Sequence, residues 1–394
     1  MSSPHIAYSK LTKTPGASPV SIKQAVMEGK GRTVIIAICA AVAVMCFFFI
    51  FSSSRPRSDG FLSRRDPKMG SVRRTIPCTD TTPCKFYILA DLDQQSKVPE
   101  SKKPKFRSVI KPASIIHQRD GSWSIRWEDD EDVFGNHNEA GRGMELSELL
   151  QWHGMLLSGD DRTGIVYEHL PTGVVAPRFI LAEGDGNTNK GMKIEWMTEK
   201  DGDLYVGSFG KEFTDATGEV VQSRNNMWVT VISPDGATKR VNWTREYDVM
   251  RETLGTPWPG YLIHEAVHWS EALRKWVILP RRVSKEKYDE DADEKRGSNK
   301  AIFCDESITR CEGVTMGQLV DPARGFSSFK FVPGTKDGVI LALKSLEDGA
   351  SGTQKSYLSV LSTAGDTLME ETEVPSGHKF EGLEFVDSWL HRIR

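Results

Sequence analysis

The stretch Gly141–Leu170, with the sequence GRGMELSELLQWHGMLLSGDDRTGIVYEHL, decides the fold. It places Ser147 among apolar residues and continues with an apolar run at 154–157, a Gly/Asp turn at 159–161 and a second apolar run at 165–167. Two apolar runs around such a turn are typical of a β-hairpin. The stretch therefore predicts a hairpin that is headed by a residue with a side-chain oxygen.

The same arrangement recurs four more times toward the C-terminus. The oxygen-bearing residues that precede the hairpins, called the heads below, are Ser147, Glu195, Glu265, Ser327 and Glu381. Successive heads lie 48, 70, 62 and 54 residues apart. Repeats of ~40–50 residues with several short strands are typical of β-propeller blades, and the longer spacings fit blades with inserted loops.

The repeats predict an all-β chain that folds as a five-bladed β-propeller. An early apolar strand, 86–90, is expected to complete the last blade and close the ring. A β-sandwich is the alternative, and it explains the number of strands but not the polar head in each repeat. The 34 glycines and 19 prolines also fit a turn-rich β structure better than a helical one.

The N-terminal region divides by composition into a polar tail over residues 1–32, an apolar run over 33–51 and a Ser/Arg/Pro-rich segment over 52–84. The apolar run, TVIIAICAAVAVMCFFFIF, carries no charge, and ~20 apolar residues span a bilayer. We therefore expect a disordered cytoplasmic tail, a single transmembrane signal anchor, a stalk and, over 85–394, the propeller domain. A cleaved signal peptide is the alternative, although its apolar core is usually ~7–15 residues long.

The orientation in the membrane rests on two features of the C-terminal part, because lysines and arginines flank the apolar run on both sides. These features are the glycosylation sequon at Asn242 and the close cysteine pairs Cys78/Cys84 and Cys304/Cys311. Both suit an oxidising lumen, with four unpaired thiols as the alternative. We expect a single-pass type II protein of the endoplasmic reticulum or Golgi with a lumenal domain, and the sequence leaves open whether cleavage of the stalk releases a soluble form.

The composition limits the partners. A formal net charge of -3 argues against nucleic acid. The Walker pattern G-x-x-x-x-G-K-[ST] and the G-x-S-x-G elbow are both absent from the sequence, which removes two common classes of phosphate-binding and hydrolase site. The sequence leaves the formation of a homodimer open.

The heads predict a metal site. The beginning of each innermost strand of a propeller lines the central channel, so five heads on such strands converge on one axis. Three heads are Glu, and neighbouring carboxylates oppose each other's ionisation unless a cation lies between them. Carboxylate and hydroxyl oxygens without sulfur are typical ligands of Ca²⁺. The alternative is that the heads lie scattered at strand ends.

One head also belongs to a competing motif. Residues 264–268, HEAVH, match the zinc protease pattern H-E-x-x-H, which needs a helix to turn both histidines to one face. The preceding residues 257–263 contain two prolines and favour an extended chain, and the longer form of the motif is broken by Glu271 and Arg274. We therefore expect calcium rather than zinc at Glu265.

Three basic residues near the heads are candidates for holding phosphate. Arg281 ends the strand that follows Glu265, Arg162 follows the Gly/Asp turn, and Lys211 follows a glycine-containing turn. A guanidinium group matches two phosphate oxygens at once. Each of the three can also be a solvated surface charge.

Eight ordered segments of the chain resemble the calcium-activated nucleotidase family, which includes the vertebrate soluble calcium-activated nucleotidases and the bed-bug type of salivary apyrase. The segments are ADLD (90–93), GRGMELS (141–147), DDRTG (160–164), GDG (184–186), GYLIHE (260–265), LPRR (279–282), GFSSFK (325–330) and EGLEF (381–385). The resemblance extends over about residues 85–386.

The resemblance implies a five-bladed propeller with a central Ca²⁺ that hydrolyses nucleoside di- and triphosphates. It implies calcium ligands at Ser147, Glu148, Glu195, Glu265, Ser327 and Glu381. It also implies roles in activity for Asp91, Asp93 and Arg281. Asp161 and Asp185 lie in further matching segments, and we expect both near the substrate.

The expected chemistry is metal-assisted hydrolysis, in which calcium neutralises charge on the phosphate oxygens and a water attacks the terminal phosphorus in line. Asp91 or Asp93 activates the water, with Asp161 behind them. Substrate is held by Arg162, Asp185, Lys211 and Arg281. In a lumen the task is to remove the UDP or GDP that glycosyl transfer leaves behind. The alternatives are a calcium-dependent propeller lactonase or esterase, and a non-catalytic calcium-stabilised propeller that binds glycans or proteins.

Overall fold

The computed structural model of the protein describes residues 76–99, 101–349 and 351–386. The tail and the membrane helix predicted over residues 1–32 and 33–51 lie outside these ranges, as does most of the predicted stalk. Within the described ranges, no helix combines the length and the apolar character that crossing a membrane requires. The described chain is already packed at Cys78, which we expected in the stalk and which is 2% exposed.

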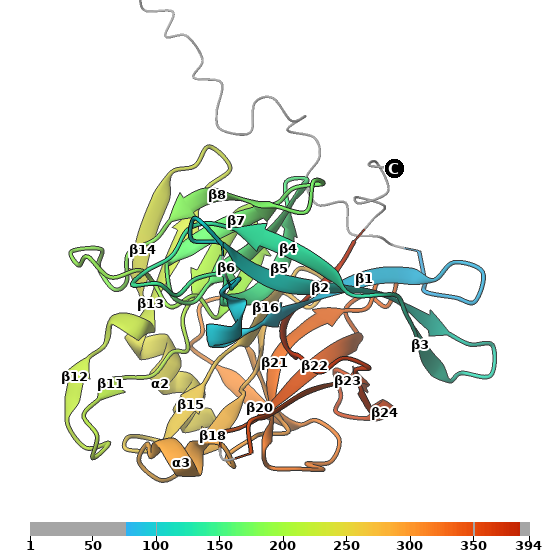
Figure 1. Ribbon diagram of the computed structural model, residues 1–394. Helices are drawn as coiled ribbons and strands as arrows, with labels where there is room; N and C mark the ends of the chain where they lie inside the picture. The colour runs from blue at the N-terminus through green and yellow to red at the C-terminus, as the bar shows by residue number, and fades with distance from the viewer. Residues whose placement is uncertain (1–75, 100, 350, 387–394) are drawn as a thin grey trace, which may run out of the picture. The chain divides into compact units, whose positions relative to one another are not determined.

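Five antiparallel sheets follow one another along the chain and form the five blades of a β-propeller (Figure 1). In four blades the strands run in order from the innermost to the outermost. They are β5 (Leu146–Trp152), β6 (Met155–Asp160), β7 (Ile165–His169) and β8 (Val175–Ile180); β9 (Trp196–Lys200), β10 (Asp203–Gly207), β13 (Trp228–Ile232) and β14 (Thr238–Asn242); β16 (Ala266–Ser270), β17 (Lys275–Leu279), β19 (Lys300–Cys304) and β20 (Cys311–Thr315); and β21 (Arg324–Phe331), β22 (Val339–Asp348), β23 (Thr353–Ser362) and β24 (Thr367–Glu373).

The fifth blade closes the ring by joining the two ends of the domain. Its innermost strand is β25 (Lys379–Phe385), which pairs with β1 (Cys84–Asp91). The remaining strands of this blade are β2 (Phe106–His117), β3 (Trp123–Trp127) and β4 (Glu131–Gly135), of which β3 and β4 both pair with β2. The prediction that the strand at 86–90 completes the last blade is therefore confirmed, as is the prediction of five blades.

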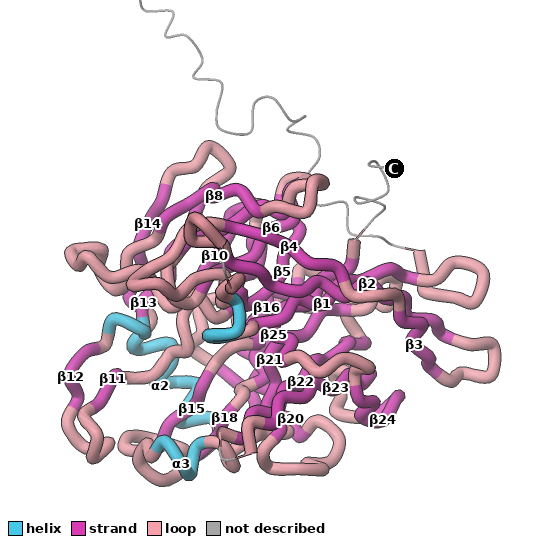
Figure 2. Tube along the Cα trace, viewed as in Figure 1, coloured by secondary structure: helices cyan, strands magenta, loops and turns pink. Residues whose placement is uncertain are grey.

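The innermost strands form a ring in the order β5, β9, β16, β21 and β25, and β25 contacts β5 again. Figure 2 shows β16, β21 and β25 in the middle of the domain and β8, β14 and β24 toward its outside. Strands near the middle are almost continuously apolar, as in β17 (KWVIL), because neighbouring blades cover both of their faces. Outer strands such as β14 (TKRVN) are polar and largely exposed.

Short insertions connect or extend the strands of this ring. They comprise the hairpin β11 (Phe213–Thr214) and β12 (Val221–Ser223), the strand pair β15 (Tyr261–Ile263) and β18 (Arg282–Ser284), the α-helices α2 (Thr244–Thr253) and α3 (Glu290–Asp293), and the 3-10 turns η1 (Asp93–Ser96) and η2 (Asn225–Met227). The pair β15/β18 matters for the site, because it carries the chain from one head, Glu265, to the arginine at 281.

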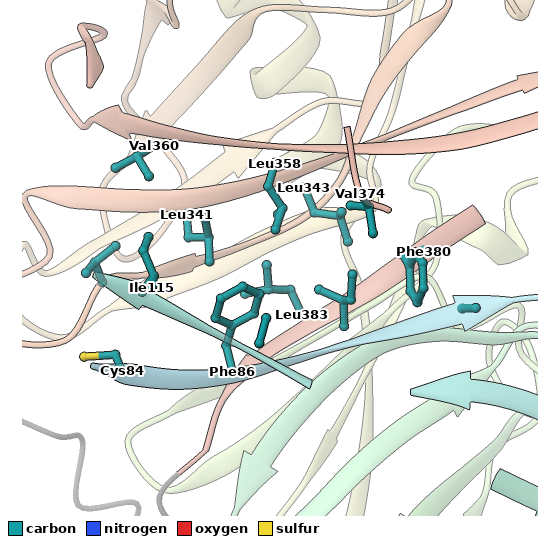
Figure 3. Close-up of a cluster of buried hydrophobic side chains, with 14 of the residues drawn as sticks. Cys84, Phe86, Ile115, Leu341, Leu343, Leu358, Val360, Val374, Phe380 and Leu383 are labelled. Atoms are coloured by element: carbon teal, nitrogen blue, oxygen red, sulfur yellow. The ribbon is translucent and has the colours of Figure 1, made fainter. Parts of the chain in front are cut away.

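The hydrophobic core lies between neighbouring blades. Figure 3 shows one such cluster, in which Phe86 and Leu383 of the closing blade face Leu341 and Leu358 of the β21–β24 blade. Fully burying one such side chain stabilises the fold by ~1.5–3 kcal/mol. Disulfide bonds join Cys78 to Cys84 beside this cluster and Cys304 to Cys311 where β19 meets β20.

Candidate active site at the propeller axis

All five heads lie on an innermost strand or directly before one, and all are buried. Glu195 and Glu265 immediately precede β9 and β16, and the other three heads lie within β5, β21 and β25. The exposed fractions are 2% for Ser147, 5% for Glu195, 8% for Glu265, 1% for Ser327 and 7% for Glu381. Polar side chains are rarely buried without partners, so this placement sets the heads apart from ordinary turn residues.

The three heads inside strands coincide with β-bulges. Ser327 and Glu381 are each the extra residue that has no opposite number on the neighbouring strand, and Ser147 lies beside the extra residue Glu148. A bulge bends its strand and redirects the side chain at the irregular position. The irregularity in these three strands is therefore what turns the side chains at the heads away from the ordinary pleat.

Arg281 brings two of the heads together. Its Nη1 lies 2.6 Å from Oε2 of Glu265 and 3.4 Å from Oε1 of Glu381, and it donates to Oγ of Ser345 at 2.8 Å. The two heads belong to β16 and β25, which β21 separates in the ring. The contact through Arg281 therefore places both carboxylates on the same side of the axis region, although 116 residues separate them in the sequence.

The two serine heads contribute hydroxyl oxygens. Oγ of Ser327 donates to the carbonyl oxygen of Phe380 at 3.1 Å, which links it to the residue before Glu381. Oγ of Ser147 is buried and makes no hydrogen bond. A buried hydroxyl without a partner is costly, so Ser147 is a candidate ligand for a group bound at the axis.

Negative charge is in excess around the heads. Seven carboxylates contact three cationic side chains there, namely Asp91, Asp93, Asp161, Glu195, Glu265, Glu347 and Glu381 with Lys193, Arg281 and Lys379. Burial, with the charges of neighbouring carboxylates, raises the pKa of Glu195 to about 8 and that of Glu381 well above its ordinary value. A divalent cation would favour the ionised form of both groups.

The pair Asp91 and Asp93 gathers around one lysine. Nζ of Lys379 lies 2.9 Å from Oδ2 of Asp91 and 3.0 Å from Oδ2 of Asp93, and Glu347 and Glu381 approach it at 3.4 and 3.5 Å. Burial opposes ionisation of Asp91, but the ammonium of Lys379 more than offsets it and lowers the pKa of Asp91. Burial and the charge of Asp91 raise the pKa of Asp93, whose side chain is 32% exposed.

Asp161 lies in a second acidic group on the neighbouring blade. Its carboxylate contacts Lys193, which also lies 2.7 Å from Oε1 of Glu195, and its backbone N–H donates to the carbonyl of Glu145 at 3.0 Å. Glu145 forms an isolated bridge with Asp91, so the two acidic groups are adjacent. Burial raises the pKa of Glu145 to about 7, although Arg142 contacts its Oε2 at 2.5 Å.

The donor chemistry at the heads fits calcium, with one restriction. Oxygen donors, an excess of negative charge and an unpartnered serine hydroxyl are what a hard cation with 6–8 oxygen ligands requires. Across the residues that the structure describes, however, no three His, Cys, Asp or Glu side chains form a metal-binding group. The heads therefore share one region, in which Arg281 bridges Glu265 and Glu381, without forming a closed cage of ligands.

Glu148 is buried among protein partners. Its Oε1 accepts from Oγ of Ser328 at 2.9 Å and from Nζ of Lys330 at 3.0 Å. Its Oε2 lies 3.3 Å from Nε2 of His268 and makes no hydrogen bond. Lys330 donates to that same Nε2 at 2.8 Å, which leaves His268 no proton there to offer to Glu148. As a calcium ligand Glu148 has one oxygen, Oε2, to contribute.

Three expected substrate residues make contacts with residues other than the heads. Asp185 is exposed and bonds Asn187, and Lys211 packs its ammonium 3.8 Å from the ring of Tyr288 while donating to the carbonyl of Glu212. Arg162 is 36% exposed and pairs with Glu139 at 3.6 Å, on the rim near Asp161. Of the expected basic residues, Arg281 is the one that contacts the heads directly.

The sequence did contain a signal for two residues that we missed. Lys193 and Lys379 each stand two positions before a glutamate head, in Lys193-Ile194-Glu195 and Lys379-Phe380-Glu381. Residues two apart in an extended chain point to the same side, so each lysine is placed next to its own head. The repetition of Lys-x-Glu at two heads predicts exactly this kind of pairing, whereas nothing in the sequence near Glu347 or Ser345 points to the site.

The zinc alternative fails on geometry. Residues 266–270 form β16, so His264 and His268 do not lie one helical turn apart. Each histidine has its own surroundings, since His264 is fully buried against Tyr247 while His268 contacts Lys330.

Elsewhere, Asn242 is exposed at the end of the outer strand β14, where a glycan has room.

Comparison with known proteins identifies the family of the chain. The family model described as "Apyrase" matches residues 92–386. The chain is 42% identical to soluble calcium-activated nucleotidase 1 of Rattus norvegicus over 77% of this chain and 73% of that protein. It is 42% identical to an apyrase of Cimex lectularius over 67% and 71% of the two chains, and 39% identical to the apyrase apy-1 of Caenorhabditis elegans over 76% and 84%. The chain therefore belongs to the apyrase family and is a nucleotide phosphoanhydride hydrolase.

Proposed function

We propose that the chain is a calcium-dependent hydrolase of nucleoside di- and triphosphates, with UDP and GDP as its main substrates in a secretory lumen. The observation that carries the proposal is the set of five buried heads on the innermost strands, where seven carboxylates contact three cations. The name of the calcium-activated relative supports the choice of metal.

The ligand set that we propose comprises oxygens of Ser147, Glu148, Glu195, Glu265, Ser327 and Glu381. Calcium held there supplies positive charge that stabilises the phosphate oxygens of the substrate as the anhydride bond breaks. Arg281 lies within hydrogen-bonding distance of two of these residues and keeps their carboxylates oriented. It also adds a fixed positive charge beside the metal position.

Asp93 is our candidate for the residue that activates the attacking water. It is more exposed than Asp91, and its raised pKa makes it the better proton acceptor near neutral pH. Asp91 stays ionised beside Lys379 and accepts the backbone N–H of Asp93 at 2.8 Å, which fixes the turn that carries both acids. Asp161 is the corresponding acid on the other side of Glu145.

The lumenal setting is part of the proposal. A signal anchor over 33–51, a glycan at Asn242 and the two disulfide bonds together suit the endoplasmic reticulum or Golgi. Glycosyl transfer in that compartment releases nucleoside diphosphates, and their hydrolysis would prevent them from inhibiting the transferases.

One assay tests the function. Phosphate release from UDP, GDP, ADP and ATP is measured with purified lumenal domain in Ca²⁺, in Mg²⁺ and in chelator. We expect release from UDP and GDP in Ca²⁺ and a loss of ~100-fold or more in chelator. Equal release in Mg²⁺ and Ca²⁺ would refute the calcium assignment, and a preference for lactone or ester substrates, or no turnover at all, would refute the substrate class.

A further inference from the structure

We propose that Lys193 and Lys379 are the residues that bind the polyphosphate of the nucleotide. This inference rests on the proposed function, because it takes the heads as the metal position and the aspartates as the groups that face the attacking water. It assigns a role to two buried or half-buried lysines that neither metal binding nor water activation uses.

Each lysine lies between a head and an aspartate. Nζ of Lys193 contacts Asp161 on one side and Glu195 at 2.7 Å on the other. Nζ of Lys379 lies 2.9 Å from Asp91, 3.0 Å from Asp93 and 3.5 Å from Glu381. A phosphate that touches the metal and is attacked by a water near an aspartate must occupy the interval between the two. The ammonium groups stand in that interval.

The two lysines are related by the repeat of the fold. Both occur as Lys-x-Glu at the start of an innermost strand, β9 for Lys193 and β25 for Lys379. Strand β5 lies between β9 and β25 in the ring, so the lysines flank it on either side. Two cations placed in this way suit a chain of two or three phosphates better than a single phosphate group.

The site is open to solvent on the side of the lysines. The side chain of Lys193 is 42% exposed, and two partners of Lys379, Asp93 and Glu347, are 32% and 41% exposed. Arg281 differs from Lys193, because its side chain is 8% exposed and already bonds two heads and a serine. The side chain of Lys379 is itself 5% exposed, so Lys193 is the cation that an incoming phosphate reaches first, and Lys379 lies deeper beside Asp93 and Glu347.

The ammonium of Lys379 is surrounded by carboxylates, so a phosphate must replace one of them as its partner. Four carboxylates approach it within 3.5 Å, which is more negative charge than one ammonium can balance. A metal ion bound by Glu381 would balance part of this negative charge and leave Lys379 able to donate to a phosphate oxygen. An ammonium group is a common partner of phosphate, with three donors and no fixed direction.

Two binding measurements on the lumenal domain test the inference, with Lys193→Gln, Lys379→Gln and the charge-retaining Lys379→Arg. Calorimetry first measures Ca²⁺ binding alone and then, at saturating Ca²⁺, binding of a methylene-bridged UDP analogue that cannot be hydrolysed. Lys111→Gln is the control, since Lys111 is a buried lysine paired with Asp130 on another part of the domain.

Each Gln variant should bind the analogue ~10- to 100-fold more weakly, which corresponds to the loss of a charge-assisted hydrogen bond. The same variants should bind Ca²⁺ as tightly as the wild type or more tightly, because a positive charge next to the heads is gone. Lys379→Arg should retain most of the affinity for the analogue, and Lys111→Gln should change neither measurement.

The inference is overturned if both Gln variants bind the analogue within twofold of the wild type, or if Ca²⁺ affinity and analogue affinity fall together. The second pattern indicates a structural role in holding the heads. A wild-type domain that binds no Ca²⁺, or that binds the analogue equally well in chelator, refutes the proposed function itself, so the two failures are distinct. Lys193→Gln is decisive where Lys379→Gln fails to fold, because its side chain is half-exposed.

Discussion

Two sets of polar residues lie on the innermost strands, and they differ in how their charge is balanced. The heads form one set. The other, called the second layer here, takes one residue from each innermost strand and consists of Glu148, Thr198, His268, Lys330 and Glu384. Four of these lie three positions after a head, which places them one step further along the same strands.

The second layer is held together mainly by contacts among its own members. Lys330 bonds Glu148 and His268, and Nδ1 of His268 lies 3.1 Å from Oγ1 of Thr198. Glu384 lies 4.0 Å from Lys330 and accepts the backbone N–H of Gln151. Strands β5 and β21 are not neighbours in the ring, so the bond between Glu148 and Lys330 runs across the axis and ties opposite blades together.

The heads have no such balance. Burial disfavours the charge of Glu148, yet the ammonium of Lys330 holds its pKa below the ordinary value, whereas the pKa of Glu195 and of Glu381 is raised. The same strands thus carry a polar layer whose one lysine lies within 4.0 Å of both of its glutamates and, next to it, the heads, around which carboxylates outnumber cations. A buried excess of one charge is expected where a ligand supplies the other, so we assign binding to the heads and, apart from Oε2 of Glu148, support to the second layer.

The largest effect should follow from a change in the head layer. Glu265→Gln keeps the shape of the side chain but removes a charge that Arg281 contacts at 2.6 Å. We expect calcium-dependent phosphate release to fall ~100-fold or more, while the melting temperature stays the same or rises because like-charge repulsion is reduced. Phosphate release and thermal unfolding are measured on the same preparation.

Glu271→Gln, an exposed glutamate at the turn after β16, is the matched control and should leave activity unchanged. Full activity of Glu265→Gln would break the assignment of binding to the heads. Loss of activity together with unfolding would instead place Glu265 with the structural residues of the second layer.

The second layer should respond in stability rather than in substrate binding. Lys330→Met leaves the carboxylate of Glu148 buried without its main partner, and removing one member of a buried ion pair costs about 3–5 kcal/mol. Adding Glu148→Gln should restore most of that loss, because no charge then remains to be compensated. Urea denaturation in chelator gives the free energies of unfolding.

A loss below ~1 kcal/mol for Lys330→Met would contradict the supporting role. The double variant Lys330→Met/Glu148→Gln also tests calcium binding, because it folds without the charge of Glu148. If Oε2 of Glu148 is a calcium ligand, as the family resemblance implies, the double variant should bind calcium more weakly than the wild type.

A smaller effect, on the pH dependence of stability, should again distinguish the heads from the second layer. The pKa of Glu195 is raised from 4.5 to about 8, so between these values the folded chain holds a proton that the unfolded chain has released. Stability in chelator should therefore fall as the pH rises from about 5 to 8. Calcium, which favours the ionised carboxylate, should reduce or reverse that fall.

Melting temperatures across this pH range, in chelator and in calcium, measure the effect. Glu195→Gln should flatten the profile in chelator, and Glu199→Gln on the same strand should not. A wild-type profile in chelator that rises from pH 5 to pH 8 would contradict the raised pKa and with it the excess of charge at the heads.

The sequence alone predicted the five-bladed ring and the positions of the heads along the chain. Each hairpin carries a local signature of turn residues and apolar runs, and the recurrence of one polar residue before each hairpin identifies the innermost strands. The closing pair β1/β25 was predictable for the same reason, because a leftover strand at one end matches an unpaired repeat at the other.

Side-chain contacts between different blades could not be predicted from the sequence. Glu347 reaches Lys379, and Ser345 reaches Arg281, through the register between strands of different repeats, which no local pattern records. The β-bulges at Ser327 and Glu381 did leave a mark that we did not use, because the buried pairs Phe326/Phe329 and Phe380/Leu383 are three positions apart, whereas regular alternation requires an even spacing.

The smallest effect on phosphate release is expected at Asp185, where the family resemblance and the structure point to different roles. Asp185 belongs to a segment, GDG, that resembles the nucleotidase family, and we expected it near the substrate. The structure exposes its side chain, and the neighbouring Gly186 packs closely against the guanidinium of Arg240 in the outermost strand β14. Outer strands lie farthest from the axis, so Asp185→Asn should leave phosphate release within about twofold of the wild type, since exposed surface substitutions rarely have larger effects. A tenfold loss with unchanged calcium binding would mean that the substrate extends over the outer edge of this blade, and the boundary between binding and supporting regions would then no longer follow the distance from the axis.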